Sequence, residues 1–363
     1  MRVVYQPPSS RKVFAAAHVA AVTGPGGVPV IDWESTLRFR EHLWAHGFGV
    51  AEAMDTAQRG MGLSWEQARE LIARTATRAA EAGRLGALAC GAGTDQLDGG
   101  PHPLRAIIDA YAEQVAFVQA CGAQVILMAS RALAASARGP RDYLEVYGEL
   151  VKQAERPVIL HWLGEAFDPA LAGYWGGGFE DAAATVLELI DRSGGQVDGV
   201  KLSVLDEGRE KWLRRRLPAG VRLYTGDDFN YASLIRGDAD GSYSDALLGA
   251  FAAITAPAAA ALAALDRGDL AGYDAAMEPT VPLSRLIFEP PTYHYKAGVA
   301  FLAWLNGLQP QFVMLGGLER ARSAGHLIRV YELAAAAGAL TKPELAAERA
   351  GEMLARSAHA GPV

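Results

Sequence analysis

One lysine lies inside a short apolar stretch of the chain, Gln196-Val197-Asp198-Gly199-Val200-Lys201-Leu202-Ser203. Strand interiors favour β-branched and aromatic residues, and a buried ammonium group is costly unless it is paired or neutral. A lysine in such a place tends to have a lowered pKa, so that its amine can attack a carbonyl carbon. The alternative is a lysine at the end of a strand, with its ammonium group in solvent or on a carboxylate. Lys201 is therefore a candidate nucleophile.

The elements that must position this lysine are short apolar strands that alternate with amphipathic helices. Strands are expected at residues 13–18, 48–53, 85–90, 124–129, 157–163, 196–203, 221–225 and 240–243. Helices are expected at residues 33–46, 64–83, 103–121, 142–154, 180–192 and 207–217, the second opened by a capping box of Ser64 and Gln67. Such alternation builds a parallel sheet, and eight units favour a closed (β/α)₈ TIM barrel over an open doubly wound sheet.

The 363-residue chain is long enough for two average domains or one large α/β domain. We expect the barrel to occupy residues 1–245 and a C-terminal helical extension, packed on the barrel, to occupy residues 246–363. A dinucleotide-binding turn is a weak alternative at Gly24-Pro25-Gly26-Gly27, because it lacks the third glycine and does not open a helix. No cofactor is expected. The excursion at residues 164–178 has the length of a lid or a binding loop.

Charge and cysteine content exclude several classes of protein. The net charge of −7 and the lack of a long basic run argue against nucleic acid as a partner. No apolar run reaches the length of a membrane span, so no membrane partner is expected. The two cysteines, Cys90 and Cys121, fit a reducing cytoplasm and have no metal-binding spacing.

Several short motifs, taken in order, resemble those of the dihydrodipicolinate synthase and N-acetylneuraminate lyase superfamily, in a divergent and uncharacterised branch. They are Leu63-Ser64 with Glu66, Pro157-Val158-Ile159-Leu160, Gly199-Val200-Lys201, Gly226-Asp227-Asp228, Asp240-Gly241-Ser242 and Tyr295-Lys296-Ala297-Gly298. The resemblance covers residues 12–318. Members of this family are class I aldolase-type TIM barrels that bind a keto compound as a Schiff base, which implies that Lys201 forms the imine.

The departures from the family pattern concern the residues around this lysine. His161 stands where the family carries a proton-shuttling tyrosine, and a histidine can do acid–base work near neutral pH. The alternative for His161 is a packed histidine with one satisfied nitrogen. Strand four leads into Ser130-Arg131 rather than into a tyrosine-rich turn, so the family's tyrosine pair is absent from both expected places.

The turn after strand two also departs from the family. The family's Gly-Thr-Thr-Gly-Glu turn holds the carboxylate of an α-keto acid, whereas this chain has Ala53-Met54-Asp55-Thr56-Ala57. Asp55 beside a substrate carboxylate would cost interaction energy unless Arg59 or a metal offsets it. We therefore expect a neutral, polyhydroxylated keto compound, with Asp55 and Thr56 holding its hydroxyl groups. A capping or loop aspartate is the alternative for Asp55.

These considerations predict a lyase that uses Lys201 for carbon–carbon cleavage, condensation or dehydration of a keto acid or an oxidised sugar, with His161 as the second catalytic residue. The predicted substrate-binding residues lie at strand ends: Asp55, Thr56, Thr94, Asp95, Ser130, Arg131, Gly226, Asp227, Ser242 and Tyr243.

Two alternatives remain open. One is a metal-dependent barrel lyase or isomerase that uses His18, Glu52, Asp55 and His161, although the lead hypothesis needs no metal. The other is a non-catalytic barrel that binds a metabolite. A small carbonyl compound is the expected partner, and the resemblance implies a homodimer or homotetramer.

Overall fold

The structure, a computed structural model, describes residues 6–54 and 58–359. Contacts within the chain divide it into two compact units. The barrel unit consists of Arg11–Ala16 and Gly49–Leu248, and the helical unit consists of Met1–Ser10, Ala17–Phe48 and Gly249–Val363. Residues 17–48, which the sequence places in the barrel domain, thus group with the C-terminal helices.

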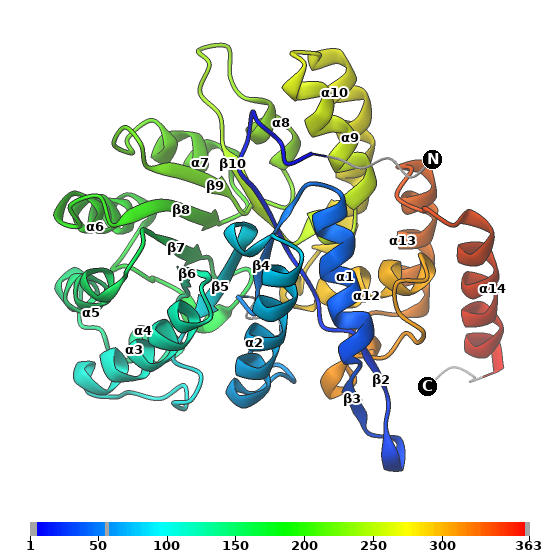
Figure 1. The fold of residues 1–363 in the computed structure, drawn as a ribbon, viewed down its shortest axis with the longest axis horizontal. Coiled ribbons are helices and arrows are strands. Elements are labelled where there is room, and N and C mark those ends of the chain that lie inside the picture. The colour runs from blue at the N-terminus through cyan, green and yellow to red at the C-terminus, as the bar shows by residue number, and fades with distance from the viewer. Residues whose placement is uncertain (1–5, 55–57, 360–363) are drawn as a thin grey trace. The chain divides into compact units, whose positions relative to one another are not determined.

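The barrel unit contains eight parallel strands in the closed order β1-β10-β9-β8-β7-β6-β5-β4 (Figure 1). The strands are β1 Val13–Ala16, β4 Gly49–Glu52, β5 Leu88–Ala92, β6 Gln124–Leu127, β7 Val158–Leu163, β8 Val197–Ser203, β9 Arg222–Thr225 and β10 Asp245–Leu248. Their parallel pairing and the closure of β1 on β10 confirm the predicted TIM barrel.

In the described part of this unit, seven α-helices follow the strands along the chain: α2 Trp65–Glu81, α3 Leu104–Ala120, α4 Arg131–Ser136, α5 Pro140–Gln153, α6 Phe179–Arg192, α7 Glu207–Arg214 and α8 Tyr231–Arg236. The predicted capping box opens α2, since the Ser64 hydroxyl accepts from the Gln67 N–H and the Gln67 side chain accepts from the Ser64 N–H. Helix α6 buries Ala183, Val186 and Ile190, at the spacing of one helix face. The two short helices α4 and α8 escape the sequence analysis because six residues do not establish a helical period.

Alternation along the strands decides which side chains fill the barrel. Ala51 on β4, Ile159 on β7 and Tyr224 on β9 belong to one buried interior cluster. At the amino-terminal end of the strands, the Tyr224 hydroxyl donates to Asp198, and Lys12 forms an ion pair with the same carboxylate. Polar contacts therefore hold this end together, and the opposite end is free to carry a site.

The eighth strand lies later in the chain than predicted. Residues 240–243 do not form it, because Asp240 accepts hydrogen bonds from the backbone N–H and the hydroxyl of Ser242. The Asp238 N–H also donates to the Ser242 carbonyl, and Gly241 has a φ of 83°. A tight turn therefore replaces the predicted strand, and β10 begins only at Asp245.

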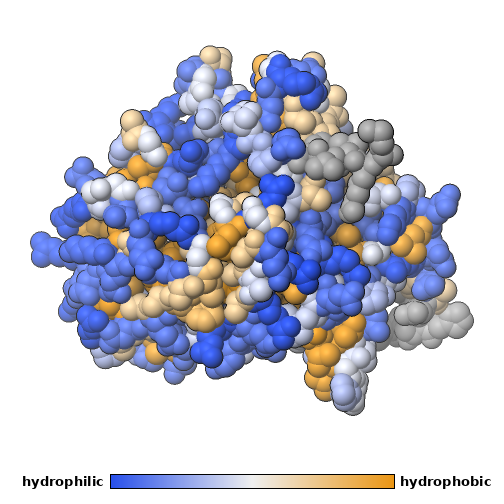
Figure 2. Space-filling model, viewed as in Figure 1, coloured by the Kyte–Doolittle hydropathy of each residue, from blue (hydrophilic) through white to orange (hydrophobic). Residues whose placement is uncertain are grey.

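The helical unit contains a two-stranded hairpin, β2 Ala21–Thr23 and β3 Pro29–Ile31, and the helix α1 Trp33–Ala45. Its other α-helices are α9 Thr255–Asp266, α10 Leu270–Met277, α11 Val281–Ile287, α12 Lys296–Leu305, α13 Ala324–Ala336 and α14 Pro343–His359. Residues 24–27, the weak dinucleotide-turn candidate, connect the two strands of the hairpin. Figure 2 shows apolar surface over this hairpin, where Val28 and Val30 are exposed. Among the described residues, no helix is long and apolar enough to cross a membrane.

Candidate active site

Lys201 points into the barrel. In the register of the sheet it lies beside His161 on β7 and Tyr224 on β9, and Tyr224 belongs to the interior cluster. The Lys201 Nζ lies 3.8 Å from the Sδ of Met54, a member of the same cluster. Only 7% of Lys201 is exposed. The structure therefore does not place the ammonium group of Lys201 in solvent.

His161 is a titratable neighbour of this lysine and is itself buried. Its Nε2 lies 3.5 Å from the Ser203 hydroxyl, while no described group bonds its Nδ1. Burial, and secondly the charge of Lys201, lower the pKa of His161 well below 6.5. The imidazole is therefore neutral at pH 7 and can accept a proton.

Gly226 approaches the lysine more closely than any side chain would allow. A Cβ atom at this position would overlap the Ser203 hydroxyl and would lie 2.9 Å from the Cε of Lys201. Glycine is needed here for this close approach. The carboxylate of the next residue, Asp227, accepts hydrogen bonds from the backbone N–H groups of Phe229 and Asn230 in the same loop. Burial raises the pKa of Asp227.

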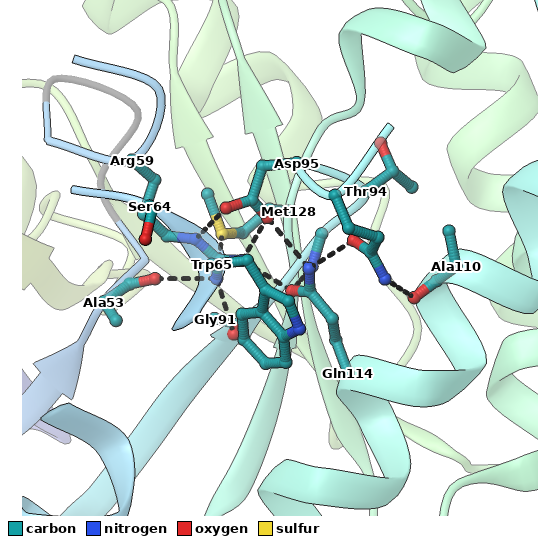
Figure 3. A network of polar contacts seen from close by, with 12 residues as sticks. Ala53, Arg59, Ser64, Trp65, Gly91, Thr94, Asp95, Ala110, Gln114 and Met128 are labelled. Carbon is teal, nitrogen blue, oxygen red and sulfur yellow. Dashed lines mark hydrogen bonds and ion pairs between the residues drawn. The ribbon is translucent and has the colours of Figure 1, made fainter. Parts of the chain in front are cut away.

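Asp95 is engaged by a buried arginine that joins the ends of β4 and β5 (Figure 3). Arg59 donates to both carboxylate oxygens of Asp95 and to the carbonyl oxygens of Ala53 and Gly91. Gln114 on α3 accepts from Arg59 at 2.6 Å and donates to Asp95 at 2.9 Å. Burial would raise the pKa of Asp95, but the charge and hydrogen bonds of Arg59 outweigh burial and lower it. Asp95 is thus a carboxylate that holds the site together.

Four predicted substrate-binding residues line one cavity of about 160 Å³: Thr94, Asp95, Ser130 and Arg131. The hydroxyl groups of Thr94 and Ser130 are 2.6 Å apart. Met128 also lines the cavity and belongs to the interior cluster that contains Met54. The cavity therefore lies next to the interior that holds the lysine.

The long loop after β7 packs against this cavity. Its Asp168 lines the cavity and accepts a hydrogen bond of 2.7 Å from Arg131. The hydroxyl of Tyr174, in the same loop, accepts from the Ser130 N–H at 3.0 Å and lies 2.8 Å from the Tyr147 hydroxyl. The loop is thus tied to the end of β6 by an ion pair and by a buried tyrosine.

Ser242 and Tyr243 do not join this group, and their expected position at the mouth of the barrel is wrong. They lie in the turn before β10, at the amino-terminal end of that strand. There the Ser242 hydroxyl accepts from Arg214, and the guanidinium of Arg11 stacks on the Tyr243 ring. The misplaced strand is the cause, because a shift of a few residues moves a side chain from one end of the barrel to the other.

Asp55 and Thr56 lie outside the described residues. The four-residue metal hypothesis meets a geometric obstacle in Glu52, whose carboxylate accepts from Thr75 on α2. Glu52 thus faces the helix layer, whereas His161 faces the interior. His18 belongs to the helical unit, where its Nε2 lies 2.6 Å from Gln309. The described residues contain no group of three or more His, Cys, Asp or Glu that could hold a metal.

Sequence reasoning missed several residues of the site, among them Gln114, Met54, Met128 and Asp168. Gln114 carries a recognisable signal, because it lies on the apolar stripe of α3 between Tyr111 and Val115, where a polar residue needs a buried partner. Met54 carries no such signal, since its position depends on a local change of backbone conformation.

The sequence assigns the chain to a family of unknown function. The chain belongs to the family described as a protein of unknown function, DUF993, whose model matches residues 1–358. No curated protein matches the sequence.

The chain is similar in structure to dihydrodipicolinate synthases. The enzyme from Aquifex aeolicus has a TM-score of 0.68 and 14% identity, with 92% of this chain and 99% of that chain covered. The enzyme from Thermotoga maritima has a TM-score of 0.65 and 14% identity, with 91% and 99% covered. That from Oceanobacillus iheyensis has a TM-score of 0.65 and 15% identity, with 89% and 95% covered. These structures, at 14–15% identity, confirm the fold that the resemblance in the sequence implies.

Proposed function

We propose that the chain is a Schiff-base-forming lyase whose nucleophile is Lys201 and whose substrate is a small keto compound. The observation that carries the proposal is the position of the buried Lys201 beside the neutral His161 on neighbouring strands, inside a barrel with the dihydrodipicolinate synthase fold. An amine enclosed next to a proton acceptor has the two groups that imine chemistry requires.

The proposed reaction begins when the Lys201 nitrogen adds to the carbonyl carbon of the substrate. The carbonyl oxygen takes up protons and leaves as water, and a C=N bond remains between lysine and substrate. The protonated imine accepts the electron pair of a neighbouring C–C or C–H bond as that bond breaks. An enamine results, and His161 takes the released proton, which comes from the hydroxyl group of the departing fragment in cleavage and from carbon in dehydration. In cleavage the enamine carbon then takes up a proton, whereas in dehydration the enamine expels the hydroxyl group of the next carbon, which leaves as water with the proton from His161. Both routes return an imine, which water hydrolyses to restore the amine. Cleavage and dehydration share these steps up to the bond that breaks.

The residues around the cavity support binding of a hydroxylated substrate. Thr94 and Ser130 offer hydroxyl groups, and Arg131 is held by Asp168 at the same cavity. Asp95 and Gly226 act by shaping the site in this proposal, since Asp95 bonds Arg59 and Gly226 has no side chain. Asp55 and Thr56 remain proposed hydroxyl ligands on the basis of the sequence. We further propose that the protein acts as a homodimer or homotetramer.

Borohydride trapping tests the proposal. The protein is incubated with pyruvate, with keto sugars or with sugar-derived keto acids, and then reduced. Borohydride delivers hydride to the C=N carbon, and the resulting secondary amine is located by peptide mass. A ligand-sized adduct on Lys201 is expected, and Lys201→Arg, which keeps the charge without a nucleophilic amine, should abolish it.

Lys152→Arg on the exposed surface of α5 is the matched control and should label like the wild type. The absence of an adduct with every carbonyl would overturn the proposal. Metal analysis of the same purified protein then tests the metal-dependent alternative. Stoichiometric binding of a keto compound without an adduct would instead support the non-catalytic barrel.

A further inference from the structure

Met54 departs from the alternation of the strand that precedes it. Ala51 belongs to the interior cluster, and Glu52 bonds Thr75 in the helix layer. Regular alternation would place Ala53 inside and Met54 outside. Met54 nevertheless belongs to the interior cluster and is only 1% exposed.

The change of direction occurs at Ala53, which has a φ of 47°. This left-handed conformation costs free energy for a residue with a Cβ atom, so the surrounding structure must impose it. Arg59 donates to the Ala53 carbonyl at 3.0 Å and to the Gly91 carbonyl at 2.9 Å, and both acceptors lie at neighbouring strand ends. The Ala53 N–H in turn donates to Glu52 at 3.0 Å.

Gly91 on β5 provides the space for this turn. A Cβ atom on Gly91 would lie 2.6 Å from the Ala53 carbonyl oxygen and 2.7 Å from the Cα of Met54. Real Cβ atoms do not approach other atoms so closely. The strained Ala53, the buried Arg59 and the glycine at position 91 therefore act together, and their common result is the position of Met54.

That position is at the amine of Lys201, with the Met54 Sδ 3.8 Å from the Nζ. A thioether is apolar and polarizable and donates no hydrogen bond. The two substituents on the carbonyl carbon that joins Lys201 each lie two bonds from the Nζ, so the one on the Met54 side packs against this side chain. A charged carboxylate in contact with a thioether loses water and gains no donor from it.

We propose that Met54 is a specificity-determining residue that makes Lys201 select neutral carbonyl compounds over α-keto acids. This inference rests on the proposed function and names its substrate class. Met54 flanks the carbonyl carbon on one side, and small neutral groups such as CH₃ or CH₂OH pack against its thioether. A carboxylate at the same carbon is desolvated there, and its imine forms less readily.

Competition between two small carbonyl compounds tests the inference. Hydroxyacetone and pyruvate differ in one substituent of the carbonyl carbon, CH₂OH against carboxylate. Equal concentrations of both are trapped with borohydride on one protein sample, and the ratio of the two Lys201 adducts is measured by peptide mass. Because the ratio is internal to each sample, partial unfolding of a variant lowers both adducts and leaves the ratio unchanged.

The wild type should favour hydroxyacetone by about tenfold or more, the discrimination expected of a buried polar mismatch. Met54→Leu keeps an apolar side chain and should keep the ratio. Met54→Gln keeps the length, adds an N–H donor, and should shift the ratio toward pyruvate by about tenfold. The matched control is Met277→Gln, since Met277 is as deeply buried as Met54 but belongs to the helical unit. It should retain the wild-type ratio.

A wild type that labels with pyruvate as well as with hydroxyacetone would overturn the role of Met54 while the imine stands. The same conclusion would follow if Met54→Gln and Met277→Gln changed the ratio equally. Failure of both compounds and of the wider carbonyl panel to label any variant would overturn the proposed function itself, and this inference with it.

Discussion

Arg59 and Asp95 form an ion pair between a buried guanidinium and a partly exposed carboxylate, built into the wall of the candidate site. The Arg59 side chain is 1% exposed and donates to both carboxylate oxygens of Asp95 (Figure 3). Its other hydrogen bonds reach the carbonyl groups that end β4 and β5. One guanidinium thus connects the turn after β4 to the turn after β5, and the pair fixes the backbone from which Met54 projects.

Removal of Arg59 should destabilise the fold. In Arg59→Ala the Ala53 and Gly91 carbonyl groups lose a buried donor, and each buried polar group left unsatisfied costs about 1–3 kcal/mol. The free energy of unfolding in urea measures this loss. Arg105→Ala is the control, since Arg105 pairs with Asp109 on the exposed surface, where a pair contributes about 0–1 kcal/mol. Equal losses in the two variants would contradict the structural role of Arg59.

Substitution of Gly226 should damage the site through Lys201. In Gly226→Ala the added Cβ meets the Cε of Lys201 and the Ser203 hydroxyl, so we expect about 1–3 kcal/mol of destabilisation and a weaker Lys201 adduct. Gly148→Ala on α5 is the matched control, because a Cβ there meets nothing within 4 Å. It should stabilise the helix by about 0.5–1 kcal/mol. Thermal unfolding and adduct yield check both expectations.

The barrel could be read from the sequence because its strands and helices are local patterns. Seven of the eight expected barrel strands overlap observed strands, whereas the strand expected at residues 240–243 is replaced by a turn and β10 begins at Asp245. The position of Lys201 followed from its strand motif. The position of Met54 did not, because it requires the left-handed Ala53, which is imposed by Arg59 and Gly91 through tertiary contacts. The Arg59–Asp95 pair likewise joins residues from different strand ends, a contact that periodicity does not encode.

His161 should act in proton transfer and not in imine formation. With a keto substrate in D₂O, the wild type should exchange the protons next to the carbonyl group, as followed by NMR. His161→Gln should lower this exchange by about 10²–10⁴-fold and retain the borohydride adduct on Lys201. Since burial lowers the pKa of His161, the exchange rate should show no inflection near pH 6.5 from this group. Loss of adduct and exchange in equal measure would assign His161 a packing role.

The buried Glu210 should make stability fall with rising pH. Burial raises its pKa from 4.5 to about 8, and its carboxyl group accepts from Thr225 and Ser244. Its contribution is complete below pH 4.5, where both states are protonated. Between pH 4.5 and about 8 the folded state keeps the proton that the unfolded state releases, so the contribution declines by up to about 1.4 kcal/mol per pH unit.

Glu210→Gln removes this titration and should flatten the pH dependence of the unfolding free energy. The difference between variant and wild type isolates Glu210 from the other titrating groups. We expect the variant to gain relative stability as the pH rises toward 8. Curves that stay parallel across the window would show that Glu210 is ionised in the folded protein.

The pairing of Val13 with Ala246 and of Phe14 with Leu247 joins the first barrel strand to the last. The ribosome makes β1 early and β10 late, so the growing chain contains an open sheet with two unpaired edge strands until residue 248 has emerged. Unpaired edge strands can form hydrogen bonds with other chains and so promote aggregation. A product truncated before β10 should therefore be a target for chaperones and aggregation, whereas one truncated within α14 keeps its cylinder closed.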